Sequence, residues 1–392
     1  MTALADETAR APERPIKVFV HLAHGETPAV WQALADKGKL IGFNDDMPYG
    51  YHRAEKMGCE VVYSSQGTKS RLINFVRLGL RVVLGFDLLH AWYNRKEALA
   101  SDIIWTHTEA QLLGMCAILS LRGKKKPRPK VLGNSVWFMD IWLKLDPVRK
   151  ALYRRLVKKA DCLTFHSPLN LEIAKGVFPD KRCELMRFGI PTEVLNAPKP
   201  RQNSPHRVIC IGNDRHRDWQ TVMAAFKDQP DIDVKIFTTK TNPSVAADYP
   251  NIEIRGLKDD AELKSQLAEA SLMIVPLIPN VHASGATVTQ EAVITGIPCI
   301  VSRAGGLEAY FDDTQISWVE PKSPEALRAA AVELLEDPEA ACAQAQRAQA
   351  KLVSGEIGSH AHARDHVIIT RQLLDLPPLS EDQLKGPEPR II

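Results

Sequence analysis

The sequence predicts an α/β protein of two Rossmann-like domains that face each other across a cleft. Apolar, β-branched runs alternate with longer amphipathic segments, which is the pattern of βα units on a parallel sheet. Four prolines and several polar residues interrupt this alternation at 190–205 and indicate a linker, after which the alternation begins again. The length of 392 residues also favours two domains over a single core.

Each half of the chain supplies one predicted series of strands and helices. In the first half we expect strands at 17–23, 59–63, 102–107, 130–135, 161–167 and 183–188, with helices at 69–84, 109–122 and 147–159. In the second half we expect strands at 207–212, 233–239, 251–255, 272–277, 299–302 and 317–319, with helices at 219–227, 260–269, 287–295, 324–335 and 362–374. A ligand held where the carboxyl ends of both sheets meet would touch both domains.

The composition is that of a soluble globular protein, with 25% charged and 45% hydrophobic residues. The polar N-terminus does not have the pattern of a secretory signal, and the sequence contains no apolar run of about 18 residues. The seven cysteines are scattered without a CxxC pair, which favours reduced thiols in a cytoplasmic protein over a disulfide framework or a zinc site.

The net charge of +3 conceals a strongly basic segment. Between Arg122 and Lys159 there are 13 Lys and Arg but only two acids, Asp140 and Asp146, which gives a local net charge of +11. Such a segment attracts phosphate groups or an anionic membrane surface, although a solvated helix face with a basic loop has the same composition. The predicted helices at 69–84 and 147–159 combine basic residues with apolar faces, so each either lies in a membrane interface or packs on its domain. No nucleic acid partner is expected, because the chain lacks a recognised binding module.

The most informative segment extends from Val281 to Glu308. It predicts a turn of small residues, a short helix that ends at Gly296, a buried strand at 299–302 and a second glycine turn. Free backbone N–H groups at a helix start bind anions. An acidic side chain one turn further on, Glu291, can accept hydrogen bonds from sugar hydroxyls. The segment therefore predicts a site for a nucleotide diphosphate and its ribose.

This segment resembles the donor domain of GT-B glycosyltransferases, most closely the retaining glycosyltransferase family 4 (group 1). The run Glu-Ala-Val-Ile-Thr-Gly-Ile-Pro that starts at Glu291 is similar to that family's Glu-Ala-x-x-x-Gly-x-Pro, and the run Gly-Gly-Leu-Glu at 305–308 is similar to its Gly-Gly-x-x-Glu. The resemblance implies that Glu291 binds the ribose hydroxyls, whereas a lone glutamate at this place would only cap or solvate a surface helix. It also implies that the preceding turn binds the diphosphate through Ser284, Gly285, Ala286 and Thr287.

The chain departs from the family at one position. The family places a second glutamate eight residues before the first, near the transferred sugar, and this chain has Ala283 there. Either His282 or Ser284 fills that space, or no side chain does. The identity of the sugar and the stereochemical course of the reaction stay open at this point.

A second motif follows the predicted strand at 207–212. The segment from Gly212 to Trp219 resembles the family's Gly-Arg-x-x-x-x-Lys-Gly loop, whose two cations neutralise the leaving diphosphate. Arg217 occupies the lysine position and is suited to bidentate phosphate contact. Asn213 occupies the arginine position, so Arg215 is the substitute we expect from a shifted place. A solvated basic loop is the alternative interpretation.

The first half of the chain is expected to provide the acceptor side. By resemblance, Gly25 follows the first strand in a glycine loop that faces the donor phosphates, and His107 at the end of the strand at 102–107 reaches the donor sugar. An ordinary turn and a buried structural histidine are the respective alternatives. Three polar residues of a glycine-containing loop are weaker candidates for an acceptor site: Asp45, Asp46 and His52.

The resemblance implies a GT-B fold with a C-terminal helix that returns to the N-terminal domain. The expected divisions are a flexible N-terminus (1–15), an acceptor-binding domain (16–197), a linker (198–206), a donor-binding domain (207–358), a crossing helix (359–376) and a tail (377–392). The implied activity is transfer of a sugar from a nucleoside-diphosphate sugar to a hydroxyl acceptor, with retention, and with Arg217 and His107 as catalytic residues. Neither a cofactor nor a metal is expected, and the sequence has no DxD-like acidic pair at a suitable strand end.

The expected acceptor is a saccharide or a lipid-linked intermediate of exopolysaccharide or lipopolysaccharide synthesis, which would account for the basic helices. The protein would then be cytoplasmic and peripheral on the inner face of the cell membrane. Three alternatives stay open: an inverting enzyme of the same fold, a non-catalytic nucleotide-sugar-binding protein, and a dinucleotide oxidoreductase. The last is disfavoured, because no GxGxxG follows the first strand.

Overall fold

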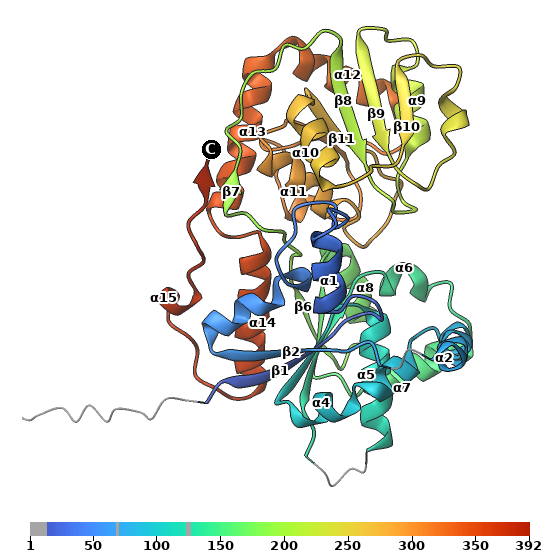
Figure 1. The fold of residues 1–392 in the computed structure, drawn as a ribbon, viewed down its shortest axis with the longest axis vertical. Helices are drawn as coiled ribbons and strands as arrows, with labels where there is room; N and C mark the ends of the chain where they lie inside the picture. Colours follow the sequence, from blue (N-terminus) through green and yellow to red (C-terminus); the bar gives the residue numbers. More distant parts are fainter. Residues whose placement is uncertain (1–13, 68–69, 123–126) are drawn as a thin grey trace, which may run out of the picture.

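The computed structural model describes residues 14–67, 70–122 and 127–392, which form two α/β domains stacked one above the other (Figure 1). Most of the predicted flexible N-terminus, and the basic residues Lys69 and 124–126, lie outside the described residues. Each domain is built on a parallel sheet of six strands, so the predicted pair of Rossmann-like domains is confirmed.

The N-terminal sheet has the strand order β2-β1-β3-β4-β5-β6. Its strands are β1 (Ile16–His21), β2 (Cys59–Tyr63), β3 (Ile103–Thr106), β4 (Lys130–Ser135), β5 (Cys162–Phe165) and β6 (Arg182–Leu185). The central strands β3 and β5 are buried at every residue, because helices cover both faces of the sheet. The register pairs Val18 of β1 with Val61 of β2 and Ile103 of β3.

The helices of this domain connect the strands and cover the sheet. They are α1 (Pro28–Ala35), η1 (Pro48–Met57), α2 (Arg71–Leu84), α3 (Leu88–Tyr93), α4 (Arg95–Ala100), α5 (Glu109–Leu121), α6 (Phe138–Trp142), α7 (Pro147–Val157) and α8 (Pro168–Val177). Helix α7 packs on the domain through Tyr153, Leu156 and Val157, which are buried. Its outer face is basic, because Arg154 and Arg155 are exposed.

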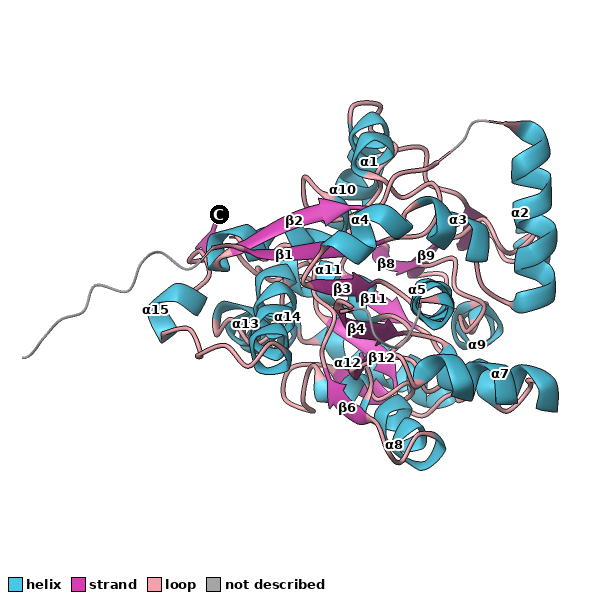
Figure 2. Cartoon of the chain, turned by 90° about the horizontal axis from the view of Figure 1, so that it is seen from below, coloured by secondary structure: helices cyan, strands magenta, loops and turns pink. Residues whose placement is uncertain are grey.

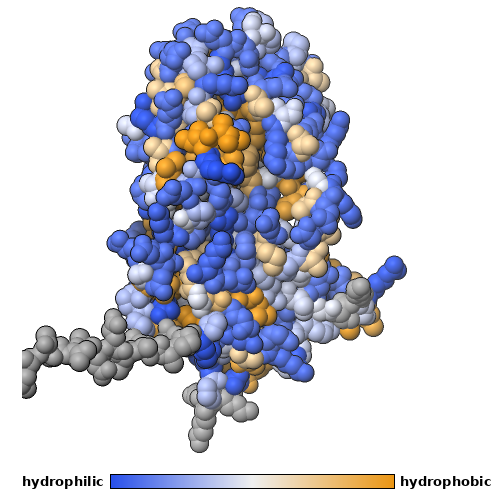
Figure 3. Space-filling model, turned by 60° about the vertical axis from the view of Figure 1, so that its left-hand side comes forward, coloured by the Kyte–Doolittle hydropathy of each residue, from blue (hydrophilic) through white to orange (hydrophobic). Residues whose placement is uncertain are grey.

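Helix α2 is the exception, because its apolar residues face outward. Arg77 is its single buried residue, while the exposed fractions of Leu72, Phe75 and Val82 are 74%, 76% and 75%. Figure 2 shows α2 at the rim of the molecule, apart from the sheets. The face that Figure 3 brings forward is instead mostly hydrophilic, with apolar residues in small patches. Within the described residues, no helix is both long enough and apolar enough to cross a lipid bilayer.

The C-terminal sheet has the strand order β10-β9-β8-β11-β12-β13. Its strands are β8 (His206–Ile211), β9 (Ile232–Phe237), β10 (Ile252–Arg255), β11 (Leu272–Val275), β12 (Cys299–Ser302) and β13 (Ser317–Val319). Its helices are α9 (Trp219–Phe226), η2 (Pro243–Ala246), α10 (Asp260–Glu269), α11 (Ala286–Ile294), η3 (Leu307–Ala309), α12 (Pro324–Glu336) and α13 (Pro338–Val353). Helix α13 was not among the predicted helices, and it buries a stripe of mostly small residues, Ala341, Ala345, Ala348 and Leu352.

The C-terminal segment connects the two domains. Helix α14 (Ser359–Leu373) returns to the N-terminal domain, where Trp105 Nε1 of β3 donates a hydrogen bond to Thr370 Oγ1 at 2.8 Å. The segment after α14, predicted to be a tail, contains secondary structure. It forms α15 (Glu381–Leu384) and then β14 (Arg390–Ile391), which pairs in parallel with β7 (Val194–Leu195) just before the linker. The backbone of 390–392 is thereby hydrogen-bonded to the chain at 193–195.

Candidate active site

The candidate site lies where strand β8 and helix α11 meet the N-terminal domain. Gly285 is the N-cap of α11 and has a φ of +93°, a conformation that residues with a side chain rarely adopt. A Cβ at this position would stand 2.7 Å from Val275 Cγ1 and 3.1 Å from Arg217 Nη1. Glycine therefore allows the guanidinium of Arg217 to pack against the start of the helix.

Arg217 is a partly exposed residue whose guanidinium has buried, unused hydrogen-bond donors. Its Nε and Nη1 atoms are buried and have no hydrogen-bond partner within the described part of the chain. Burial lowers the pKa of Arg217 to about 10, against the opposing attraction of Asp214 and Glu291. A buried charged donor without a partner costs stability, so these N–H groups are suited to an anion that is not part of the chain.

Glu291 lies one turn into α11 and points toward the other domain. Its side chain is buried, with 8% of the residue exposed, and Phe43 N donates a long hydrogen bond of 3.4 Å to its Oε1. Burial raises the pKa of Glu291 to about 7, while the Phe43 N–H and Arg217 act in the opposite direction. Gly42 belongs to the same contact, because a Cβ there would stand 2.7 Å from Glu291 Oε1.

A cavity of about 270 Å³ lies beside Glu291, at the carboxyl ends of β9 and β10. Its lining comes from both domains: Ile41, Gly42, Ile211, Asn213, Phe237, Thr238, Thr239, Gly256, Leu257, Leu263, Thr287, Val288 and Glu291. The side chain of Asn213 is engaged in the protein itself, because its Oδ1 accepts hydrogen bonds from Thr239 N at 2.7 Å and from Thr238 Oγ1 at 3.2 Å. A ligand in this cavity would contact both domains, because Ile41 and Gly42 come from the N-terminal domain and the other lining residues come from the C-terminal domain.

A second cavity of about 170 Å³ lies beside Glu291 on the side that faces the N-terminal domain. It is lined by aromatic residues that include Trp31, Phe43, Tyr49 and Phe188. The ring of Tyr49 stacks on His107 with centroids 3.6 Å apart, and the Tyr49 backbone has a φ of +57°. Strained non-glycine residues of this kind cluster at ligand sites.

His107 lies beneath Tyr49, and its Nδ1 is 3.0 Å from the hydroxyl of Tyr51. Burial, with some repulsion from His166 and His366, lowers the pKa of His107 to about 3, so the ring is neutral near pH 7. His107 lines neither cavity itself, and its predicted role stays a prediction. Its access to a ligand, however, depends on the position of Tyr49.

The other predicted residues are in different surroundings. Gly25 has a φ of +99° and no atom within 4 Å of the place where a Cβ would stand, so it faces open space. Asp45 lines the second cavity but is ion-paired with Arg53 at 2.5 Å. Asp46 and Arg215 are exposed. His52 lies in η1 and lines neither cavity. The roles of all these residues stay predictions.

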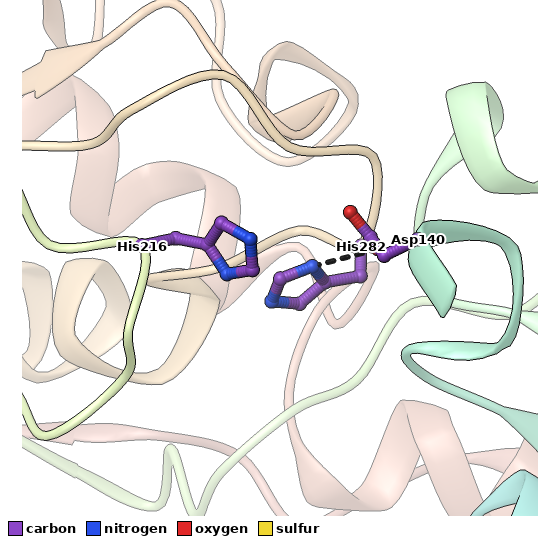
Figure 4. A group of neighbouring side chains, drawn as sticks. All are labelled: Asp140, His216 and His282. Carbon is purple, nitrogen blue, oxygen red and sulfur yellow. Dashed lines mark hydrogen bonds and ion pairs between the residues drawn. The ribbon is translucent and has the colours of Figure 1, made fainter. Parts of the chain in front are cut away.

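The structure also brings together five residues of the two domains that no sequence motif connects. His282 is buried, with Nδ1 2.9 Å from Asp140 Oδ2 (Figure 4) and Nε2 3.1 Å from Asp214 Oδ2. His216 Nδ1 lies 3.1 Å from Asp214 Oδ1, and Ser284 Oγ donates to Asp214 Oδ2 at 2.7 Å. Asp140 belongs to α6 of the N-terminal domain, so this contact also joins the domains.

Electrostatic interactions within this cluster oppose the effect of burial. Burial disfavours a charged Asp214, but hydrogen bonds from His282, Ser284 and the His216 N–H outweigh it and hold the pKa of Asp214 well below its usual range. Burial likewise disfavours a charged His282, yet the two carboxylates raise its pKa above the ordinary value. From sequence, His282 and Ser284 are candidates only to replace the missing glutamate at Ala283. Asp140 is there only one of the two acids in the basic segment.

Comparisons with known proteins identify the type of the second domain. Residues 205–337 match the family model described as "Glycosyl transferases group 1", so the predicted resemblance is confirmed for this domain. No curated protein sequence matches the chain.

Solved structures resemble the whole chain. A sucrose-phosphate synthase from Thermosynechococcus elongatus is 17% identical with a TM-score of 0.64, and the alignment covers 92% of this chain and 99% of that one. HepE from Anabaena, in complex with UDP and glucose, is 12% identical with a TM-score of 0.61 and coverages of 92% and 100%. A UDP-forming α,α-trehalose-phosphate synthase from Burkholderia xenovorans is 12% identical with a TM-score of 0.60 and the same coverages.

These structural similarities confirm the GT-B fold. The family match indicates a glycosyltransferase domain of group 1 at residues 205–337.

Proposed function

We propose that this protein transfers a sugar from a nucleoside-diphosphate sugar to a hydroxyl acceptor, with retention of the anomeric configuration. The observation that carries the proposal is the buried guanidinium of Arg217, whose Nε and Nη1 lack partners within the described chain. It lies at the start of α11, where helix N–H groups also attract anions. HepE was solved with UDP-glucose as well as with UDP, which supports a donor of this class.

The donor would occupy the cavity of about 270 Å³ beside Glu291. The ribose hydroxyls would hydrogen-bond to the Glu291 carboxylate, and the diphosphate would lie against Arg217 and the backbone of Gly285, Ala286 and Thr287. When the bond to the sugar breaks, negative charge develops on the departing diphosphate. Arg217 and the helix N–H groups are already oriented toward that charge, which is the arrangement that stabilises a transition state most effectively.

The N-terminal domain would provide the remaining contacts to the sugar. Gly25 faces open space and His107 lies behind Tyr49, so we expect Tyr49 to change position when a donor binds. A neutral His107 would act as a hydrogen-bond partner of the sugar near pH 7, rather than as a cation. Retention is tested directly by NMR, because the coupling constant of the anomeric proton distinguishes the two possible products.

The acceptor is proposed to be lipid-linked, because α2 has the properties of an interfacial helix. Its outward face carries Leu72, Phe75 and Val82, each about three-quarters exposed. Two polar contacts attach α2 to the rest of the domain. Arg77 forms a buried ion pair with Asp87, and Arg149 Nη2 donates a hydrogen bond to the carbonyl of Val82 at 2.9 Å. The apolar face is therefore held outward by polar contacts on the opposite side.

Basic residues flank this apolar face. Arg71 and Arg81 on α2 are exposed, and the exposed Arg154 and Arg155 lie on α7, the helix that carries Arg149. An apolar helix face with adjacent cations is suited to the boundary between head groups and acyl chains of an anionic membrane. The proposed location is the cytoplasmic inner face of the cell membrane, in exopolysaccharide or lipopolysaccharide assembly. The seven free cysteines suit such a reducing compartment.

The donor is identified by calorimetry with UDP-, GDP- and ADP-sugars. Wild type, Glu291→Ala and Arg217→Ala are compared with Arg328→Ala on α12 as a matched control outside the site. We expect one nucleotide class to bind wild type and the control equally, and to bind both site variants at least about tenfold more weakly, since hydrogen bonds to charged groups contribute about 1.5–3 kcal/mol each. Equal binding by all four proteins would refute the assignment.

A further inference from the structure

Two histidines and one aspartate from three separate segments converge where the domains meet (Figure 4). Asp140 lies on α6, His216 in the loop between β8 and α9, and His282 in the loop between β11 and α11. Each offers one ligand atom, and these atoms all lie within 4.8 Å of one another. The separation of 2.9 Å between His282 Nδ1 and Asp140 Oδ2 also suits two ligands of one metal ion, each about 2.1 Å from it.

A fourth residue, Asp214, orients both imidazole rings. Its Oδ1 lies 3.1 Å from His216 Nδ1, and its Oδ2 lies 3.1 Å from His282 Nε2. Metal-binding histidines usually engage a carboxylate with the ring nitrogen that does not bind the metal. This arrangement leaves His216 Nε2 and His282 Nδ1 for a shared ligand, and Figure 4 shows His216 directing Nε2 toward His282.

Asp214 is itself held in place on both oxygens. Ser284 Oγ donates to its Oδ2 at 2.7 Å, and the His216 backbone N–H donates to its Oδ1 at 3.0 Å. The orientation of the two rings is therefore set before any ligand arrives. A preformed set of two imidazole nitrogens and one carboxylate oxygen is characteristic of Zn²⁺ and similar transition-metal ions.

The charge of the cluster also favours a cation. Asp140 and Asp214 place two carboxylates beside the loop that leads into Gly285, where the proposed function locates a diphosphate. Like charges at such short range repel unless a cation lies between them. A proton on His282 would supply one positive charge but would leave His216 Nε2 without a partner in the described chain, whereas a divalent ion would use all three ligand atoms.

We infer that Asp140, His216 and His282 form a binding site for a divalent transition-metal ion of the Zn²⁺ class, with Asp214 as the carboxylate that orients both histidines. The ion would bridge the domains, because Asp140 comes from the N-terminal domain and both histidines come from the C-terminal domain. This inference goes beyond the proposed function. It also replaces the expectation from sequence that no metal takes part.

The test measures metal binding by the full-length, chelator-treated protein without any nucleotide. Co²⁺ is titrated while its visible ligand-field absorption is recorded, and Zn²⁺ is titrated by calorimetry. The variants are His216→Gln, His282→Gln and Asp140→Asn, with Asp214→Asn for the orienting role. The control is His24→Gln, a histidine of the N-terminal domain outside the cluster. Circular dichroism establishes that each variant is folded before titration.

We expect one ion per chain in wild type and control, with a Co²⁺ spectrum typical of nitrogen and oxygen ligands in low coordination. Each ligand variant should bind at least about tenfold more weakly and lose that spectrum, and Asp214→Asn should weaken binding by about 10–100-fold. Absence of binding in wild type, or equal binding by all variants, would overturn the inference. Because no nucleotide is present, failure of the donor assignment would not affect this result.

Discussion

Helices α11 and α2 are both rich in apolar residues, yet their surroundings are opposite. In α11, eight of nine residues are buried, including Glu291, which faces the candidate donor cavity. In α2, Arg77 alone of 14 residues is buried, and the apolar side chains face outward. Apolar composition therefore serves two purposes in this protein. In α11 it buries the helix that carries Glu291, and in α2 it forms the surface that we propose contacts a membrane.

The largest expected effect would test the function of the buried helix. Replacing Arg217 with Ala removes the guanidinium that lies against the start of α11, and we expect kcat to fall by about 10²–10³, as for the loss of one preorganised donor. Arg217→Lys should recover only part of the activity, since lysine keeps the charge but loses the planar fork. Sugar transfer is measured with the nucleotide that calorimetry identifies. An unchanged kcat in Arg217→Ala would mean that the guanidinium at the start of α11 does not take part in the reaction.

The next effect concerns the exposed helix. Replacing Phe75 and Val82 together with Ser should reduce sedimentation with anionic vesicles by about 100-fold or more, because burying each such side chain contributes about 1.5–3 kcal/mol. Protein stability should stay unchanged, since both side chains are exposed in the free protein. Val245→Ser, at an exposed position on η2, is the matched control. The membrane role would be contradicted if the Phe75/Val82 double variant and Val245→Ser sedimented equally with vesicles. It would also be contradicted if wild type sedimented equally with vesicles that contain and that lack anionic lipid.

The pH dependence of protein stability should also distinguish α11, which carries Glu291, from α2. Burial raises the pKa of Glu291 from its ordinary value of 4.5 to about 7. Between these values the folded protein keeps a proton that the unfolded chain releases, so the free energy of unfolding falls as the pH rises, by up to about 3 kcal/mol. Urea denaturation of the ligand-free protein at about pH 5 and about pH 8 measures this change.

Glu291→Gln should remove this part of the pH dependence and be the more stable protein above about pH 7. Glu291→Gln should also bind nucleotide more weakly. The two results together would show that the buried Glu291 carboxylate binds the ligand but lowers the free energy of unfolding. No comparable pH effect is expected from α2, whose apolar face does not titrate. If wild type and Glu291→Gln had the same pH profile, the Glu291 carboxyl would not be desolvated in the free protein.

The smallest effect concerns α14. This helix is largely buried, as α11 is, but it packs on the N-terminal domain although it lies near the C-terminal end of the chain. Thr370→Val removes the acceptor of the 2.8 Å hydrogen bond from Trp105 Nε1 and leaves a buried donor unpaired. We expect a loss of about 1–3 kcal/mol in the free energy of unfolding, with no change in vesicle binding. Unchanged stability would mean that α14 contributes little to holding the two ends of the chain together.

The strands could be predicted well because their signal is local. The expected ranges 59–63, 130–135, 299–302 and 317–319 coincide with β2, β4, β12 and β13. Buried parallel strands are short apolar runs bounded by turn residues, so neighbours in sequence carry the information. Helix α13 was missed because its buried stripe consists mainly of alanines, which are not recognised as a core-facing apolar run.

The sequence by itself determined the two-domain α/β architecture and two motifs, one with Arg217 and one with Gly285 and Glu291, because each motif depends on residues close together in the chain. Only the tertiary structure decided that α2 faces outward while α7 packs inward, that Tyr49 covers His107, and that Asp140 meets His282 across 142 positions of sequence. No periodicity links residues so far apart. Their contact follows from how two independently folded sheets are placed against each other.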